Sequence, residues 1–282
     1  MSTPVILQII HGMQEYSGRY QAFRDFLEDQ GIQTAAQDLI GHGPEAFARG
    51  NLGYFPEDWF HLVQEQIDFL QKLKAENPHA KIIVLGHSMG SFAARSLAAV
   101  AGDLLDGLII MGTAQMPSHM PKFAFTLAQA VVSLKGKRYQ SQFLRDLALG
   151  NYNKPFQPAQ TGVEWLSRDP AIQAKYLADP LCNFLPTASM FQGIFQGLAY
   201  VCPEKNMAKI PHDLPILLVS GADDPVGQAG KAVQTIYHKM QKLGFSQLEQ
   251  KLYPGMRHEI LNELGKEEVY QDLFQWIKKV TA

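Results

Sequence analysis

Cysteine is scarce in this chain: only Cys182 and Cys202 occur among 282 residues. Two cysteines without the spacing of metal ligands exclude a disulfide-rich scaffold and a cysteine-based zinc site. A disulfide between the two stays open, but nothing in the sequence favours it. The stretch 1–13 has a short apolar core and no basic leader, so it does not resemble a secretory signal. We therefore expect a cytoplasmic protein with two free thiols.

A strong net charge and a long apolar run are lacking as well. The formal net charge is −2 and the pI is near 6.5, which gives no reason to expect long-range attraction to nucleic acid or to anionic lipid. The one dense basic run, Lys135–Arg138, is interpreted as a solvated loop. No segment approaches the ~20 apolar residues that span a bilayer. Neither nucleic acid nor an integral membrane segment is predicted.

What the chain does contain is a series of short apolar runs, most of which end at a glycine, separated by helical patterns. The clearest runs lie at 5–10, 81–86, 105–112 and 214–221, and weaker ones at 34–38 and 248–253. Runs of this kind are typical of buried parallel strands. Their alternation with helices predicts an α/β fold with a mostly parallel sheet and right-handed crossovers. With 46% hydrophobic residues, the length suits one large domain, or one domain with an insertion.

The alternation breaks between residues 115 and 203, where helical patterns at 123–134 and 188–201 occur without a convincing strand. This region predicts a helical cap inserted between two core segments, 1–114 and 204–282. Its aromatic residues are either the core of the cap or the lining of an apolar pocket over the strand ends. They are Phe123, Phe125, Phe143, Phe156, Trp165, Phe184, Phe191 and Phe195.

One motif points to chemistry. Residues 85–91 read LGHSMGS, directly after an apolar run and directly before an alanine-rich helical stretch. A glycine two residues on either side of Ser88 allows a sharp strand-to-helix turn that holds the serine hydroxyl above the sheet. The same pattern can also be an ordinary turn, so the nucleophile hypothesis depends on partners elsewhere in the chain.

Suitable partners follow in the expected order. A serine needs a base to take its proton and an acid to orient that base, and on a parallel sheet these come as serine, acid, histidine. Asp223 and Asp224 follow the run that ends at residue 221, and His258 follows the next strand-like run. The aspartates could instead form a turn that caps a helix, and His258 could be a solvated loop residue. Order and position together favour a triad.

The oxyanion of an acyl-transfer reaction needs two backbone N–H donors, one after the nucleophile and one in the loop after the first strand. These positions are Met89 and Met13. Glycine at residue 12 would let that loop approach the serine closely, although a strand-ending turn explains it equally well. The chemistry implies neither a metal nor an organic cofactor.

These residues resemble the α/β-hydrolase superfamily, within the branch that includes monoacylglycerol lipases, lysophospholipase-like esterases and serine aminopeptidase-type hydrolases. The resemblance spans nearly the whole chain and implies the α/β-hydrolase fold. Its G-x-x-D pattern selects Asp224 over Asp223, which gives the triad Ser88, Asp224 and His258. The stretches that carry it are HGMQEYSGRY (11–20), DLIGHG (38–43), GHSMGS (86–91), SGADDPVG (220–227) and GMRHEILNE (255–263).

The chain also departs from the family pattern. Tyr16 and Ile40 stand where the family often has histidine and arginine. Relatives usually carry two further strands before the one that ends in HG, so we expect about six strands here rather than eight. The strand near 34–38 would then be an exposed edge, which invites pairing between two copies of the chain. A homodimer is accordingly one expectation.

Taken together, the residues and the resemblance predict a serine hydrolase that cleaves carboxylic esters through an acyl-enzyme. The resemblance and the aromatic cap suggest an apolar acyl chain, as in a monoacylglycerol, a lysophospholipid or a similar small ester. Two alternatives remain. An aminopeptidase-like amidase would need an acid near the cap for a free amine, for which Glu164 or Asp169 could serve. A non-catalytic ligand-binding protein could use the same fold.

Overall fold

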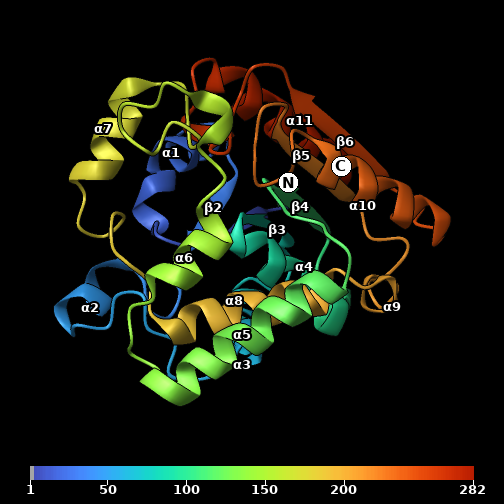
Figure 1. Ribbon diagram of the computed structural model, residues 1–282. Coiled ribbons are helices and arrows are strands. Elements are labelled where there is room, and N and C mark those ends of the chain that lie inside the picture. Colours follow the sequence, from blue (N-terminus) through green and yellow to red (C-terminus); the bar gives the residue numbers. More distant parts are fainter. Residues whose placement is uncertain (1–2) are drawn as a thin grey trace.

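Six parallel strands form the centre of the molecule. The computed structural model describes residues 3–282, and the strands lie in the order β2-β1-β3-β4-β5-β6 (Figure 1). This confirms the predicted parallel sheet of about six strands, with the weak strand β2 at one edge. The bounds are β1 Val5–Ile10, β2 Gln33–Ala36, β3 Lys81–His87, β4 Gly107–Met111, β5 Ile216–Gly221 and β6 Leu248–Tyr253.

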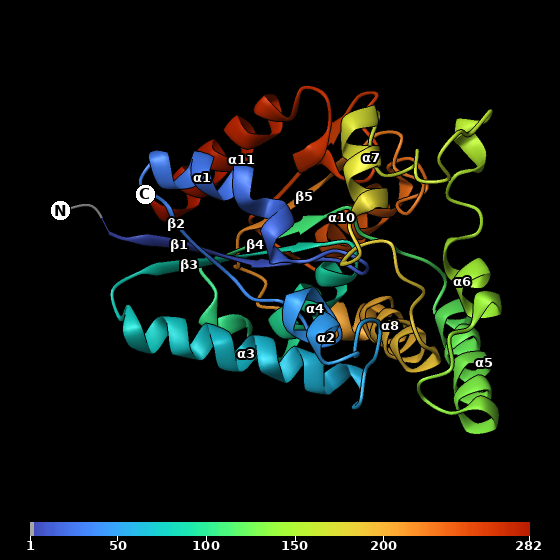
Figure 2. The same ribbon diagram turned by 90° about the vertical axis from the view of Figure 1, so that its left-hand side faces the viewer.

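Helices cover both faces of this sheet. Figure 2 shows α1 and α11 on one face and α3 and α4 on the other. The helices are α1 Gln21–Asp29, α2 Gly43–Ala48, α3 Trp59–Glu76, α4 Met89–Ala101, α5 His119–Lys135, α6 Gln142–Leu149, α7 Pro170–Ala178, α8 Ala188–Val201, α9 Glu204–Met207, α10 Lys231–Lys242 and α11 Lys266–Thr281. None of those between residues 3 and 282 combines the length and apolar character that crossing a bilayer requires.

Alternation along the strands divides the hydrophobic core in two. In β3, Ile82 and Val84 pack toward the face covered by α3 and α4, whereas Ile83 and Leu85 pack toward α1 and α11. Successive side chains of a strand point to opposite faces, so a strand covered on both sides must be apolar throughout. This explains why β3, β4 and β5 appear in the sequence as largely apolar runs. In β1 the run is interrupted by Gln8, which is buried and donates to Oε1 of Gln66 (3.3 Å).

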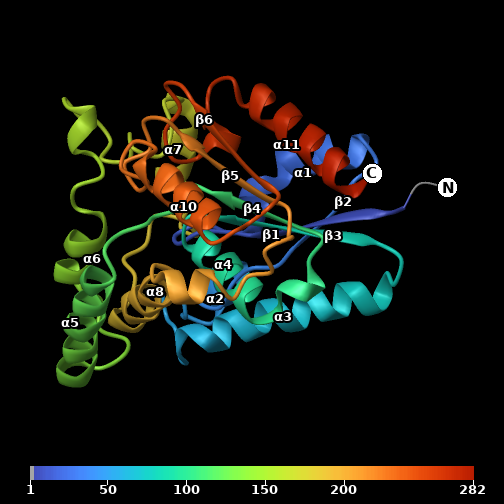
Figure 3. The ribbon, with the colours of Figure 1, turned by 90° about the vertical axis from the view of Figure 1, so that its right-hand side faces the viewer.

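The chain between β4 and β5 is helical, as predicted. The helical patterns at 123–134 and 188–201 correspond to α5 and α8, which pack against each other. Figure 3 shows α5 and α6 beside the sheet at the end opposite the amino terminus, where the parallel strands end. We call residues 115–203 the cap. Its description as a unit separate from the core segments 1–114 and 204–282 stays a prediction.

Both junctions of the cap meet at one buried arginine of α4. The Arg95 guanidinium donates to the carbonyl oxygens of Ala114 (3.1 Å) and Val201 (2.9 Å) and to Oε1 of Gln115 (2.9 Å). Gln115 Nε2 in turn donates to the carbonyl of Cys202 (2.8 Å). Burial lowers the pKa of Arg95 to about 10. The entry and exit of the cap are therefore fixed side by side; we call this group the Arg95 clasp.

Candidate active site

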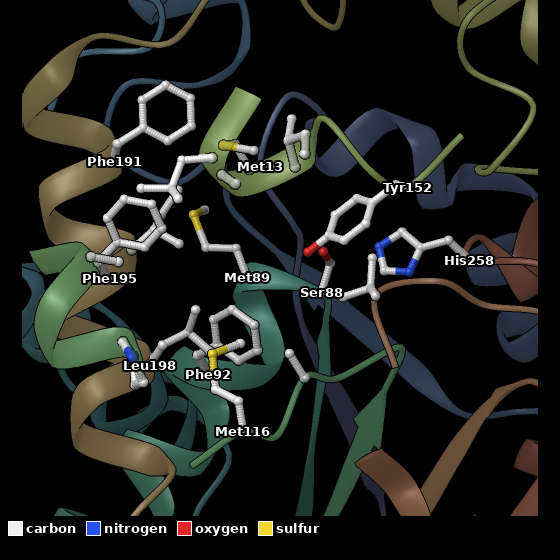
Figure 4. A pocket seen from close by; sticks show the side chains of 18 of the residues that line it. Met13, Ser88, Met89, Phe92, Met116, Tyr152, Phe191, Phe195, Leu198 and His258 are labelled. Atoms are coloured by element: carbon white, nitrogen blue, oxygen red, sulfur yellow. The ribbon is translucent and has the colours of Figure 1, made fainter. Parts of the chain in front are cut away.

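Ser88 occupies a sharp turn between β3 and α4. Its φ of 53° lies in the left-handed region, which non-glycine residues rarely adopt. A Cβ on Gly90 would overlap the carbonyl oxygen of Ile10, and one on Gly86 would overlap the carbonyl oxygen of Gly90. The two glycines of the motif thus let α4 begin directly against β1 and β3. Figure 4 shows the Ser88 side chain facing a cavity.

Asp224 and His258 are held together by a buried hydrogen bond. His258 Nδ1 lies 3.0 Å from Asp224 Oδ2, and both side chains are almost fully buried. Asp224 also accepts from the Ser220 hydroxyl (3.0 Å) and from the Val226 N–H (2.9 Å). Burial alone would raise the pKa of Asp224, but the His258 ring and these donors outweigh it and lower that pKa. The neighbouring Asp223 is exposed.

The third predicted member, Ser88, shares a cavity with His258. Ser88 and His258 both line it (Figure 4), yet among residues 3–282 no hydrogen bond joins Ser88 Oγ to His258 Nε2. Hydrogen bonds of this kind are often long in ligand-free sites and tighten when substrate binds. The structure therefore joins two of the predicted residues directly and brings the third to the same cavity.

The cavity has a volume of about 530 Å³ and two unlike sides. In Figure 4 the apolar side chains of Phe92, Phe191, Phe195 and Leu198 lie on one side of Ser88, and the ring of His258 lies on the other. The apolar side is built by α4 and α8, which pack against each other. A mostly apolar cavity with a few polar groups is typical of a small-molecule site.

The two predicted oxyanion residues also line this cavity. Met89 is the first residue of α4, where backbone N–H groups have no partner within the helix. Met13 follows Gly12, whose N–H donates to Oε1 of Glu15. The loop after β1 and the start of α4 thus meet at the cavity, which is the arrangement that two converging donors require.

Comparisons with known proteins show the family of this chain. A family model described as "Serine aminopeptidase, S33" matches residues 3–265. The chain belongs to this family. It is 25% identical to the monoacylglycerol lipase of Mycolicibacterium smegmatis over 276 residues (96% of this chain, 87% of that protein) and 25% identical to the monoglyceride lipase of Homo sapiens over 280 residues (98% and 83%). The solved structure of a carboxyl esterase from Bacillus coagulans, in complex with glycerol, is 28% identical with a TM-score of 0.92, covering 100% of this chain and 92% of that one.

In this member of the S33 family, a buried carboxylate, that of Glu15, lines the cavity beside the nucleophile turn. Glu15 accepts from the Tyr20 hydroxyl (3.0 Å) and from His87 Nδ1 (2.9 Å), and the His87 ring lies 4.7 Å from the ring of His258. Burial alone would raise the pKa of Glu15 and lower that of His87, but their mutual attraction reverses both directions. Sequence reasoning did not single out this pair. Its only signal was that each residue lies within one of the quoted motifs, Glu15 in HGMQEYSGRY and His87 in GHSMGS.

Arg19 extends the same buried network toward the cap. Its guanidinium pairs with Glu259, the residue after His258, and lies 3.9 Å from Glu15. The Arg19 guanidinium also stands 5.1 Å from the ring centre of Tyr176 in α7. An arginine between two carboxylates and an aromatic ring is well suited to hold separate elements together. The loop after β1, the histidine loop and α7 are joined here.

Irregular chain of the cap binds directly to the loop that carries His258. The backbone N–H groups of His258 and Glu259 donate to the carbonyls of Trp165 (3.3 Å) and Leu166 (2.8 Å). The Trp165 ring lies 5.2 Å from the ring of His258 and 5.2 Å from that of Tyr152. Tyr152 was not foreseen, because it lies in a segment without helical or strand periodicity. We call residues 151–168 the cap loop.

The acids considered for binding a free amine have other roles. Glu164 accepts from Asn153 Nδ2 (2.7 Å) and from backbone N–H groups of the cap loop, and Asp169 caps α7 through the N–H of Ala171 (2.9 Å). Neither lines the cavity. Within residues 3–282, no three histidine, cysteine or acidic side chains are grouped to hold a metal ion.

Proposed function

We propose that this protein is a serine hydrolase that cleaves small carboxylic esters with an apolar acyl chain through an acyl-enzyme intermediate. The general class, a carboxylic ester hydrolase, is confirmed by relatives that are a monoacylglycerol lipase and a carboxyl esterase. One observation carries the residue assignment: a serine on a strained strand-to-helix turn shares a largely apolar cavity with a histidine that a buried aspartate holds.

Each of these groups has a separate role in the proposed reaction. Ser88 Oγ attacks the ester carbonyl carbon while His258 Nε2 accepts its proton, and Asp224 stabilises the imidazolium that forms. The backbone N–H groups of Met13 and Met89 stabilise the negative carbonyl oxygen. When the intermediate collapses, His258 returns the proton to the leaving alcohol. Water then attacks the acyl-enzyme while His258 accepts the proton of the water. His258 returns this proton to Ser88 Oγ as the acid leaves.

The substrate class follows from the two sides of the cavity. An acyl chain gains about 0.8 kcal/mol for each methylene that it buries against an apolar wall, and such a wall lies beside Ser88. A cavity of about 530 Å³ suits one acyl chain and a small alcohol rather than a triacylglycerol. A monoacylglycerol, a lysophospholipid or a similar small ester is the substrate we propose. The two acids considered for the amidase alternative, Glu164 and Asp169, lie outside the cavity, so the geometry favours the ester.

A fluorophosphonate probe tests the assignment. We expect one covalent adduct by intact-protein mass on the wild type and none on Ser88→Ala, with hydrolysis of p-nitrophenyl esters lost in the same variant. Ser133→Ala is the control, since Ser133 is an exposed serine of α5 that does not line the cavity. A wild type that stays unlabelled while still binding esters would make the protein a ligand-binding member of the fold.

We also propose a homodimer and a cytoplasmic location. Strand β2 is the sheet edge next to β1, and pairing of two copies along it would give a homodimer. Edge strands as short as its four residues often resist such pairing, so light scattering of the purified protein is the direct test, and a monomeric mass excludes the dimer.

Cys182 and Cys202 are both free and buried, which supports a cytoplasmic location.

A further inference from the structure

Tyr152 is the cap residue that approaches the reacting groups. Its ring is half-buried and lies 5.2 Å from the ring of Trp165, which in turn lies 5.2 Å from the ring of His258. Figure 4 shows its hydroxyl directed toward the Ser88 side chain, and both residues line the cavity. A phenol at this place is therefore within the space that a substrate bound to Ser88 must fill.

The hydroxyl of Tyr152 is available as a donor. Among the described residues 3–282 no protein group accepts a hydrogen bond from it, and the half-buried residue lines the cavity, so its hydroxyl can reach a ligand there. Burial and the negative charge of Asp224 both raise the pKa of Tyr152. The group consequently keeps its proton at neutral pH and acts as a hydrogen-bond donor rather than a base.

The position of Tyr152 decides which part of the substrate it meets. A tetrahedral carbon on Ser88 Oγ carries three other groups: the oxyanion, the acyl chain and the leaving oxygen. In the proposed reaction the oxyanion faces Met13 and Met89, and the acyl chain follows the apolar side. The leaving oxygen remains on the side of His258, which must protonate it. Tyr152 lies on that side in Figure 4.

We propose that the Tyr152 hydroxyl donates a hydrogen bond to the leaving alcohol oxygen, which makes Tyr152 a further catalytic residue for esters of poor leaving groups. The inference rests on the proposed serine esterase function. During collapse the bond between the carbonyl carbon and the leaving oxygen breaks, the carbonyl double bond re-forms, and the proton on His258 moves to the leaving oxygen. Tyr152 keeps its own proton throughout and only stabilises the negative charge that develops as this bond breaks.

The test compares leaving groups with one acyl chain. Tyr152→Phe removes the hydroxyl but keeps the ring on Trp165. For ethyl and glyceryl octanoate we expect kcat/KM to fall about 10- to 100-fold, because the developing alkoxide loses one donor. For p-nitrophenyl octanoate we expect less than roughly a 3-fold change, since nitrophenolate leaves without protonation. The measure is kcat/KM because it reports acylation, the step in which this oxygen leaves.

Tyr139→Phe is the control, since Tyr139 is a cap tyrosine with 44% of its surface exposed and does not line the cavity. An equal loss on all three esters would overturn the inference, as would no loss at all. Loss on the glyceryl ester alone would also overturn it, because the phenol would then bind a hydroxyl of the alcohol. Fluorophosphonate labelling of Tyr152→Phe at the wild-type rate shows that the nucleophile is intact. An unlabelled wild type would instead remove the proposed function itself.

Discussion

The two sides of the cavity are built in different ways. On the core side, Ser88 follows β3 directly, and Asp224 and His258 lie in the loops after β5 and β6, so the parallel sheet brings all three to one edge. On the cap side, Tyr152 and Trp165 come from irregular chain. Trp165 is held by a hydrogen bond and a ring contact with the histidine loop, and Tyr152 by its ring contact with Trp165. Strand ends form a rigid frame for chemistry, whereas a cap can vary its chain and so vary the substrate.

The largest effect should come from the core side. In Asp224→Asn the His258 ring loses the acceptor that sets its tautomer and the charge that stabilises imidazolium, so we expect kcat to fall about 10⁴-fold. Asp223→Asn, one residue away and exposed, should leave kcat within roughly 2-fold. Steady-state hydrolysis of a p-nitrophenyl ester measures both. Equal losses in the two variants would contradict the assignment of Asp224.

The buried Glu15–His87 pair should contribute to stability rather than to chemistry. We expect Glu15→Gln to lower the free energy of unfolding by about 3 kcal/mol near pH 6, because one partner of a buried ion pair is removed. The control is Glu45→Gln, whose ion pair with Arg49 is exposed and should be worth less than about 0.5 kcal/mol. Urea unfolding of the three proteins gives both values.

The difference in the free energy of unfolding between the wild type and Glu15→Gln should depend on pH, because folding shifts the pKa of both Glu15 and His87. The pKa of Glu15 is lowered on folding, so its contribution is present above about pH 4.3 and is lost as pH falls through the lower folded value. The pKa of His87 is raised, so its contribution is complete below about pH 6.5 and is lost as pH rises through the folded value. The difference between wild type and Glu15→Gln should shrink from about pH 6.5 upward. A difference that grows with pH would exclude the ion pair.

A substitution in the Arg95 clasp tests how much the stability of the cap depends on its two junctions with the core. Arg95→Met leaves the carbonyls of Ala114 and Val201 without a donor, but it also removes a buried cation, so we expect a loss of only about 2 kcal/mol. Hydrogen exchange should rise at 113–117 and 199–203 and stay unchanged in β1 and β3. Arg145→Met, an exposed cap arginine, is the control. An equal loss of protection from hydrogen exchange in all elements, β1 and β3 included, would mean that the Arg95 clasp supports the whole fold.

The sequence predicted the core side better than the cap side, for a physical reason. Apolar runs that end in glycine place the strand ends, and the order of Ser88, Asp224 and His258 then follows from the sheet. The pairing of Glu15 with His87 joins residues 72 positions apart, and no local pattern encodes it. Tyr152 lies in a segment without helical or strand periodicity, where tertiary contact with Trp165 decides the direction of the ring.

The smallest predicted effect concerns the apolar side, where core and cap meet in α4 and α8. Phe195 lines the cavity and stacks with Phe191 at 6.3 Å, so Phe195→Ala opens space for a longer acyl chain. We expect the ratio of kcat/KM for p-nitrophenyl dodecanoate over the butyrate to rise roughly 10-fold. A ratio measured on one sample cancels any loss of folded protein. Phe143→Ala, an exposed cap phenylalanine outside the cavity, should leave the ratio unchanged. If both variants left it unchanged, the acyl chain would have to bind elsewhere, and the division of the cavity into an acyl side and an alcohol side would fail.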